Sequence, residues 1–362
     1  MVINNLALSN YRNYLSDEIT FSDGINILYG DNAQGKTNIL EAIYILATTK
    51  SHRTSKDKEL INFNSAESHI KAIVNKRDID YRIDMHLKKN KAKGVAIDRV
   101  PVRKTSQLMG LVNVILFSPV DLDIIKNGPS ERRHFMDMEL CQLNKIYYSN
   151  LSSYNKILNQ RNNLLKNIYF DKSQIDMLDI WDTQLVEYGI KIIKDRNNFI
   201  DKINNIILDI HKKLTNDKEI IRVSYDKNVS EDDFARELLA KRDQDLRYQS
   251  TQVGPHRDDM SFYIDDIDVK TYGSQGQQRT AALSLKLSEI ELVKEITGDN
   301  PILLLDDVMS ELDSSRRDAL LSSINDIQTI ITCTGYDDFI KERLTIDKVY
   351  KVSKGTIQQV TI

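Results

Sequence analysis

Cysteine is scarce in this chain of 362 residues, which has only Cys141 and Cys333. The two lie far apart, and neither belongs to a Cys-x-x-Cys pair or stands beside a histidine at metal-ligand spacing. This scarcity argues against a disulfide framework and against a zinc site built on these thiols. It fits a reducing compartment, so we expect a cytoplasmic protein.

Long apolar runs and prolines are also lacking. No stretch approaches the roughly 18 consecutive apolar residues of a membrane-spanning helix, and residues 1–5 lack a basic region followed by an apolar run. With 5 prolines, 41% apolar and 28% charged residues, the composition is that of a globular chain. We therefore expect neither membrane insertion nor secretion.

A basic excess is missing as well, because 50 Lys and Arg stand against 53 Asp and Glu, for a net charge of −3. Any surface that binds nucleic acid must therefore be a local patch. One candidate contains a single acid, Asp98, among the basic residues Lys88, Lys89, Lys91, Lys93, Arg99, Arg103 and Lys104. Further basic residues follow the first predicted helix: Lys50, Arg53, Lys56 and Lys58. Contacts from them to DNA phosphate would be indifferent to base sequence, and a solvated hairpin is the alternative interpretation.

Hydrophobic periodicity predicts a mixed α/β core. Helices are predicted at residues 38–47 and 275–295. Strands are predicted at residues 3–8, 19–21, 25–29, 70–74, 81–87, 111–117, 259–264, 302–305 and 329–333. Between the two parts of this pattern, residues 121–246 are largely helical.

We interpret residues 121–246 as an inserted helical lobe, and residues 1–120 and 247–362 as the core around it. A long antiparallel coiled-coil arm is not expected. About 100 residues form only a few helices of ordinary length, and no strict heptad repeat persists.

A glycine-rich loop between the predicted strand 25–29 and the helix 38–47 matches G-x-x-x-x-G-K-[ST]. It consists of Gly30, Asp31, Asn32, Ala33, Gln34, Gly35, Lys36 and Thr37. Such a loop wraps backbone N–H groups around phosphate at a helix N-terminus. Lys36 would reach the β- and γ-phosphates, and the Thr37 hydroxyl would bind magnesium. The loop predicts ATP and Mg²⁺ as cofactors.

Two acids follow the apolar strand 302–305. A carboxylate at the end of a buried parallel strand is where such folds bind magnesium, so Asp306 is the candidate metal ligand. Asp307 would orient the attacking water or act as general base. Without the phosphate loop, two acids in a surface turn would explain the same residues.

A third motif opens the helix 275–295, with Ser274, Gly276 and Gln277 at its start. A serine there is explained by helix capping alone. The order of phosphate loop, Ser-x-Gly-Gln and acidic strand end nevertheless resembles the ABC-type ATPases, including the SMC group. That resemblance implies a P-loop ATPase fold of mixed sheets packed on helices. It also implies that the three residues act in trans, on the nucleotide of a second subunit.

Further segments narrow the resemblance to the RecF family and span most of the chain. They are Tyr11-Arg12-Asn13-Tyr14, residues 32–38, Ser51-His52-Arg53, Gly128-Pro129-Ser130-Glu131-Arg132-Arg133, Gly254-Pro255-His256-Arg257-Asp258-Asp259 and residues 305–313. The resemblance implies a slow, DNA-dependent ATPase of recombinational and gap repair, in the RecFOR pathway and the SOS response. It implies an ATP-bound homodimer, gapped or junction DNA as ligand, and RecR with RecO as partners.

The same resemblance assigns further site residues. Arg12, Asn13 and Thr334 would contact ATP, and the D-loop at the dimer seam would be Ser310, Glu311, Leu312 and Asp313. Asp307 stands where ABC transporters have a longer glutamate, so slow turnover is expected. Thr334 lies where many relatives have histidine, and no glutamine of the ABC type follows the strand 111–117.

Two other functions remain open: an ABC transporter ATPase subunit, and an ATP-gated clamp with vestigial hydrolysis. The histidines do not help to choose among these functions. His69 and His86 lie in predicted strands, where a structural role is favoured over a ligand role. His52 and His256 stand in family-like motifs, near the nucleotide or the dimer seam or else in structural positions.

Overall fold

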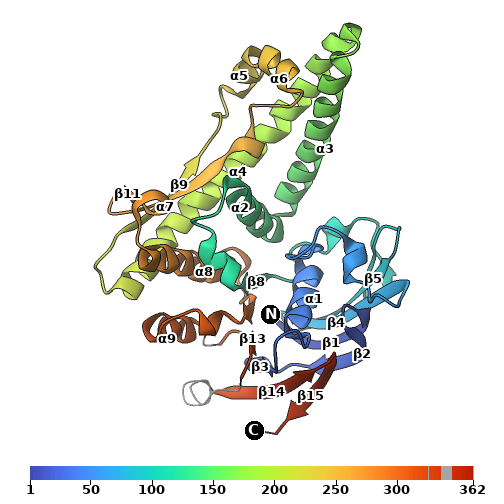
Figure 1. Cartoon of the computed structure of the whole chain (residues 1–362), viewed down its shortest axis with the longest axis vertical. Helices are drawn as coiled ribbons and strands as arrows, with labels where there is room; N and C mark the ends of the chain where they lie inside the picture. Colours follow the sequence, from blue (N-terminus) through green and yellow to red (C-terminus); the bar gives the residue numbers. More distant parts are fainter. Residues whose placement is uncertain (325, 336–344, 362) are drawn as a thin grey trace. The chain divides into compact units, whose positions relative to one another are not determined.

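The computed structural model describes residues 1–324, 326–335 and 345–361, and it divides into two compact units. Unit 1 comprises Met1–Leu122 and Lys286–Ile362, and unit 2 comprises Asp123–Leu285. Unit 2 is therefore an insertion in the sequence of unit 1 (Figure 1). Helix α8 (Gln275–Thr297) begins in unit 2 and ends in unit 1.

The first sheet of unit 1 has the strand order β15-β14-β3-β13-β12-β8. Its strands are β3 (Ile25–Tyr29), β8 (Val114–Phe117), β12 (Ile302–Asp306), β13 (Thr329–Cys333), β14 (Ile346–Ser353) and β15 (Thr356–Val360). All neighbours are parallel except β14 and β15. β8 and β13 are buried along their whole length, which explains their continuous apolar sequence.

The second sheet of unit 1 is antiparallel, with the order β2-β1-β4-β5-β6-β7. Its strands are β1 (Val2–Tyr11), β2 (Tyr14–Thr20), β4 (Glu67–Lys76), β5 (Ile79–Lys88), β6 (Gly94–Ile97) and β7 (Val100–Pro101). Buried and exposed residues alternate along β4 and β5, so one face packs on the core and the other meets solvent.

Helix α1 (Lys36–Thr48) follows β3 and is buried around its circumference. It contacts β8, β12 and β13, while its Glu41 bonds to Tyr11 and Arg12 at the end of β1. The helix begins after Gly35, whose φ is 118°, and ends at Thr49, whose N–H donates to the Ile45 carbonyl. In the same unit, α9 (Ser314–Ser323) is capped by the Asp313 carboxylate.

Unit 2 is built on three helices: α2 (Pro129–Leu143), α3 (Lys145–Ile168) and α4 (Leu178–Thr215). Figure 1 shows α3 and α4 running side by side. The expectation of ordinary helix lengths was wrong, because α4 has 38 residues. This helix needs no heptad repeat, because it packs against several different elements. They are α2, α3, the short helix at residues 234–240 and the strand at residues 221–226.

Unit 2 also contains strands that the sequence did not predict. β9 (Ile221–Asp226) and β11 (Ile267–Asp268) flank β10 (Asp259–Ile264) in one small sheet, beside α5 (Phe234–Ala240), α6 (Arg242–Tyr248) and α7 (Val269–Tyr272). The sequence assigned residues from 247 onward to the core, but unit 2 extends to Leu285 because β10 pairs with β9. Among the described residues, no helix is long and apolar enough to cross a membrane.

Candidate functional site

The glycine-rich loop joins the carboxyl end of β3 to the first turn of α1. Gly30 and Gly35 have φ of +152° and +118°, a region that residues with side chains rarely adopt. A Cβ on Gly30 would lie 2.3 Å from the Val352 carbonyl oxygen, and one on Gly35 would lie 2.8 Å from the Tyr14 hydroxyl. Only glycine fits at these two positions.

Side chains and a turn from distant parts of the chain hold this loop. Asn13 Nδ2 donates to the Gln34 carbonyl at 2.8 Å, and the Tyr14 hydroxyl donates to that of Gly35 at 3.0 Å. The β14–β15 turn adds Lys354 N–H on Gln34 Oε1 at 2.7 Å and Gly355 N–H on the Gln34 carbonyl at 3.1 Å. Sequence reasoning missed this turn, although Lys-Gly after an apolar strand is a hairpin signal.

Lys36 lies folded over the loop. Its Nζ donates to the carbonyl oxygens of Gly30 and Asp31 at 2.5 and 2.9 Å. Lys36 is buried, whereas Asp31, Asn32 and Ala33 are exposed to solvent. The ammonium is therefore already inside the loop, which suits the recognition of phosphate oxygens.

The structure brings Thr37 and Asp306 together, although they are far apart in the sequence. The Thr37 hydroxyl donates to Asp306 Oδ1 at 2.9 Å. The same oxygen accepts from the hydroxyl of buried Thr332 at 2.8 Å. A hydroxyl and a carboxylate are oxygen donors of the kind that Mg²⁺ prefers, so this pair fits a magnesium ion. Sequence reasoning missed the part played by Thr332.

Asp307 has a left-handed backbone with φ 55°, and its N–H donates to Thr332 Oγ1 at 3.0 Å. Burial is the main influence on its carboxyl and raises its pKa. The Lys36 ammonium lowers that pKa, and the carboxylates of Asp306 and Glu311 raise it. A carboxyl with a raised pKa is better matched to accepting a proton near neutral pH.

Arg12 and Thr334 are also predicted to contact ATP, but the structure supports these two contacts less directly. The Arg12 guanidinium donates to both Glu41 oxygens at 2.8 and 2.6 Å and to the Glu59 carbonyl at 2.9 Å. Thr334 is exposed just after β13. Both remain predictions as nucleotide ligands, whereas Asn13 contacts the loop itself.

His52 follows α1 and packs edge-on against Tyr44, with ring centroids 5.2 Å apart. Its buried Nδ1 meets no hydrogen-bonding partner among the described residues. Burial lowers the pKa of this imidazole, and the charges of Glu41 and Asp306 act in the opposite direction. An approach of His52 to the nucleotide or to the dimer seam therefore stays a prediction.

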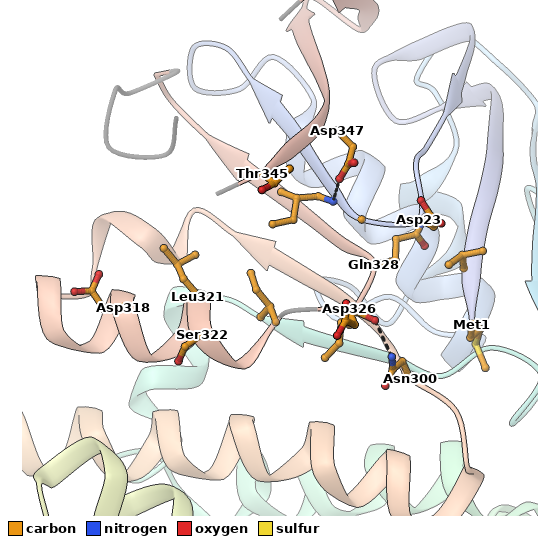
Figure 2. Close-up of a pocket in the computed structure, with 15 residues that line it drawn as sticks. Met1, Asp23, Asn300, Asp318, Leu321, Ser322, Asp326, Gln328, Thr345 and Asp347 are labelled. Carbon is orange, nitrogen blue, oxygen red and sulfur yellow. Dashed lines mark hydrogen bonds between the residues drawn. The ribbon is translucent and has the colours of Figure 1, made fainter. Parts of the chain in front are cut away.

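A sizeable cavity lies elsewhere in unit 1. Its volume is about 990 Å³, and Ile25, Gln328 and Asp347 in its wall stand at or beside the amino ends of β3, β13 and β14 (Figure 2). The loop and Asp306 stand at the carboxyl ends of these parallel strands, so the cavity belongs to the opposite edge of the sheet. Carboxylates that repel phosphate line it: Asp23, Asp318, Asp326 and Asp347.

In unit 2, Ser274 and Gln277 form a reciprocal helix cap. Ser274 Oγ accepts from the Gln277 N–H at 3.2 Å, and Gln277 Oε1 accepts from the Ser274 N–H at 2.9 Å. Gln277 Nε2 also donates to Glu219 at 3.0 Å. The capping role is thus present, and Ser274 is exposed immediately before α8, with Gly276 in the first turn of the helix.

The candidate D-loop follows Asp307 in unit 1. The Ser310 hydroxyl donates to the Asp307 carbonyl at 2.7 Å, and Asp313 caps α9. Ser310, Glu311 and Asp313 are exposed, and Leu312 is buried. The segment therefore presents a polar surface anchored by one apolar side chain.

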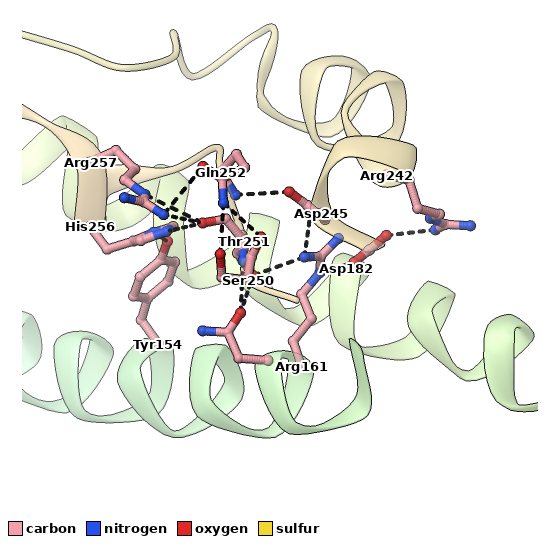
Figure 3. Close-up of polar contacts among 11 residues, drawn as sticks. Tyr154, Arg161, Asp182, Arg242, Asp245, Ser250, Thr251, Gln252, His256 and Arg257 are labelled. Carbon is pink, nitrogen blue, oxygen red and sulfur yellow. Dashed lines mark hydrogen bonds and ion pairs between the residues drawn. The ribbon is translucent and has the colours of Figure 1, made fainter. Parts of the chain in front are cut away.

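The Gly-Pro-His motif forms part of the interior of unit 2. His256 Nδ1 accepts from the Tyr154 hydroxyl at 2.7 Å, and its Nε2 donates to the Thr251 carbonyl at 3.0 Å (Figure 3). Burial lowers the pKa of His256 to about 4. Nearby, Arg161 donates to Asp245 and Thr251. These contacts give His256 a structural role.

The candidate DNA-binding residues differ in their solvent exposure and in their ion pairs. Lys93 Nζ donates to Asp57 at 2.9 Å and to the Thr49 carbonyl. Lys88 pairs with Glu67 at 3.0 Å, and Arg53 bonds to Asn38 at 2.8 Å. Lys56 pairs with Glu59 at 3.8 Å, whereas Lys50, Lys89 and Lys91 are exposed.

Comparison with known families and proteins identifies what the chain is similar to. The family model of the RecF/RecN/SMC N terminal domain matches residues 2–358. A DNA replication and repair protein RecF from Lachnoclostridium phytofermentans is 57% identical, over 99% of this chain and 100% of its own length. A protein of the same name from Lachnospira eligens is 58% identical, over 99% of both chains.

Solved structures of similar proteins superpose on almost the whole chain. The recombination mediator protein RecF-ATPrS of the RecFOR pathway superposes with a TM-score of 0.93 at 36% identity, covering 99% of this chain and 98% of that one. RecF-ATP gives 0.92 at 37% identity, with coverages of 99% and 97%. An SmcHead structure, at 16% identity and a TM-score of 0.59 over 100% and 98%, shares the fold.

Proposed function

This chain belongs to the RecF family of DNA replication and repair proteins, and on that premise we propose an ATP-switched, DNA-binding protein of recombinational and replication-gap repair. It acts in the RecFOR pathway and the SOS response, with RecR and RecO as partners. Its DNA ligand is gapped DNA or a single-strand to double-strand junction. An ABC transporter subunit is disfavoured, since relatives of the repair family match the full length.

ATP binds to the loop at residues 30–37. The loop amides surround the phosphates, and Lys36 exchanges the carbonyls of Gly30 and Asp31 for phosphate oxygens. The observation that carries this proposal is the hydrogen bond between Thr37 and Asp306. It joins a carboxylate at the end of β12 to the hydroxyl of the residue that follows Lys36 in the loop. Thr37 and Asp306 would hold magnesium there, and the ion would supply positive charge that offsets the phosphate charge during hydrolysis.

Asp307 orients the attacking water and takes its proton. The hydroxyl of Thr332 fixes both acids, through Asp306 Oδ1 and the Asp307 N–H. Because the Asp307 side chain is one methylene shorter than glutamate, its reach to the water is poorer. Turnover is therefore slow, and DNA accelerates it.

ATP also joins two copies of the chain. Ser274, Gly276 and Gln277 at the start of α8 in one copy cap the γ-phosphate held by the other. The support is that Ser274 is exposed and stands at the N-terminus of a 23-residue helix, where the positive end of the helix dipole favours anions. The exposed D-loop residues line the same seam. Hydrolysis releases the dimer.

One experiment tests these steps: ATP turnover and oligomeric mass are measured with and without gapped DNA. We expect wild type to dimerise with ATP and to hydrolyse it faster with DNA. Lys36→Ala loses nucleotide binding. Ser274→Arg binds ATP but stays monomeric, whereas Ser173→Arg, at an exposed serine elsewhere in unit 2, behaves as wild type.

A Ser274→Arg variant that dimerises normally with ATP contradicts the trans arrangement. ATP-dependent dimerisation without measurable turnover, with or without DNA, contradicts the hydrolytic switch. It favours the alternative of a clamp whose hydrolysis is vestigial.

A further inference from the structure

Three polar side chains gather on the solvent face of the β4–β5 pair. His69 of β4 lies directly opposite His86 of β5, and Glu67 is two residues before His69. Residues two apart in a strand share one face, so all three point outward. The two imidazole rings are stacked, with centroids 4.1 Å apart and planes 17° apart.

The ligand atoms of these side chains converge. His86 Nε2 lies 3.1 Å from one Glu67 oxygen, and His69 Nε2 lies 3.9 Å from the other. One such atom from each residue falls within 4.8 Å of those of the other two. Donors around a tetrahedral zinc ion are about 3.4 Å apart, since each lies about 2.1 Å from the metal. Small rotations of these side chains close the difference.

We propose that Glu67, His69 and His86 form a surface site for a divalent transition-metal ion, with Zn²⁺ as the preferred occupant and water as the fourth ligand. Imidazole favours Zn²⁺, Ni²⁺ and Cu²⁺ over Mg²⁺, so the magnesium that accompanies ATP does not compete. The rearrangement is small because the side chains of His69 and His86 are 51% and 34% exposed, outside the packed core.

Lys88 competes with a metal ion for the Glu67 carboxylate. Its ammonium lies 3.0 Å from the Glu67 carboxylate, on the strand position opposite Glu67. A metal ion takes over as the cation on Glu67 and displaces Lys88. Removing the lysine charge therefore strengthens metal binding, whereas a merely structural cluster of hydrogen bonds predicts no such gain.

The test is calorimetric titration of Zn²⁺ into the full chain, stripped of metal and kept in millimolar Mg²⁺. We expect one site in wild type, at least tenfold weaker binding in His69→Ala and in His86→Ala, and tighter binding in Lys88→Gln. The control is His134→Ala, which removes an exposed histidine from α2 and leaves the affinity unchanged.

Circular dichroism establishes that each variant is folded. With folded variants, Zn²⁺ binding that survives in both His69→Ala and His86→Ala overturns the proposal. So does weaker binding in Lys88→Gln, because it shows that the lysine supports the site instead of competing for it. Visible absorption of bound Co²⁺ in wild type, lost in both histidine variants, supports the proposal independently.

Discussion

At the scale of single residues, Thr332 connects the two carboxylates at the end of β12. Thr332→Val keeps the side-chain shape but removes the hydroxyl that donates to Asp306 and accepts from the Asp307 N–H. We expect ATP turnover to fall about tenfold, the rate equivalent of roughly 1.4 kcal/mol, with little loss of ATP binding in the absence of magnesium. Steady-state kinetics over a range of magnesium concentrations measure this.

Thr20→Val is the control for Thr332→Val, because Thr20 is exposed at the end of β2 and has no part in the proposed site. We expect this variant to keep the turnover of wild type. If Thr332→Val also keeps it, the link from Thr332 to Asp306 and Asp307 does not position the metal site.

His256 gives unit 2 a pH dependence of stability. Its pKa falls from 6.5 to about 4 on folding. Between these values the unfolded chain binds a proton that the folded chain does not, so stability is lost as pH falls below 6.5. At pH 5 the loss is about 2 kcal/mol.

Urea unfolding at pH 7 and pH 5, followed by fluorescence of Trp181, measures this loss. Trp181 is the single tryptophan and packs against the Leu164 cluster of unit 2. We expect His256→Asn to lose less stability between the two pH values than wild type does. Equal losses in the two proteins would show that other groups cause the pH dependence.

At the scale of elements, the β14–β15 turn supports the phosphate loop. Gly355 has φ +75°, and a Cβ there would lie 2.3 Å from the Asn13 carbonyl oxygen. Gly355→Ala therefore shifts the turn, or introduces roughly 1–3 kcal/mol of strain. We expect ATP affinity to weaken about tenfold in a chain that remains folded.

Gly94→Ala in β6 is the control for Gly355→Ala. A Cβ on Gly94 meets only His86 Cβ, at 3.9 Å. ATP affinity, measured by fluorescent nucleotide displacement, should be unchanged in this variant. An unchanged affinity in Gly355→Ala would mean that the loop keeps its shape without the turn.

Sequence periodicity predicted the elements that carry a strong local signal. The ends of β3, β10 and β13 match the structure, and the helix predicted at residues 38–47 lies within α1 (Lys36–Thr48). Charged and polar residues interrupt the apolar pattern of β14 and β15, which were missed for that reason. β9 was missed because its six alternating residues stand in a segment interpreted as helical. The contacts of Tyr14, Thr332 and Gly355 with the site depend on long-range packing, which no local pattern encodes.

At the scale of the whole molecule, a net charge of −3 predicts that the proposed DNA binding uses a local basic patch. Lys89 and Lys91 are exposed, whereas the Lys93 ammonium is held by Asp57 and Thr49. We expect Lys89→Gln with Lys91→Gln to reduce the slope of log affinity against log salt by about 1.8.

Fluorescence anisotropy with gapped DNA across a salt series measures this slope. Lys93→Gln should leave the slope unchanged, because its ammonium is already neutralised within the fold. A reduced slope in Lys93→Gln and an unchanged slope in the double variant would place the phosphate contacts elsewhere.

The position of β3 in its sheet determines when the nucleotide site can form during translation. β3 is made early, but both of its neighbours, β13 and β14, come from the end of the chain. A fragment that ends before β13 lacks both neighbours of β3, so its phosphate loop would follow an unpaired strand. We therefore expect such fragments to bind ATP more weakly than the full chain does.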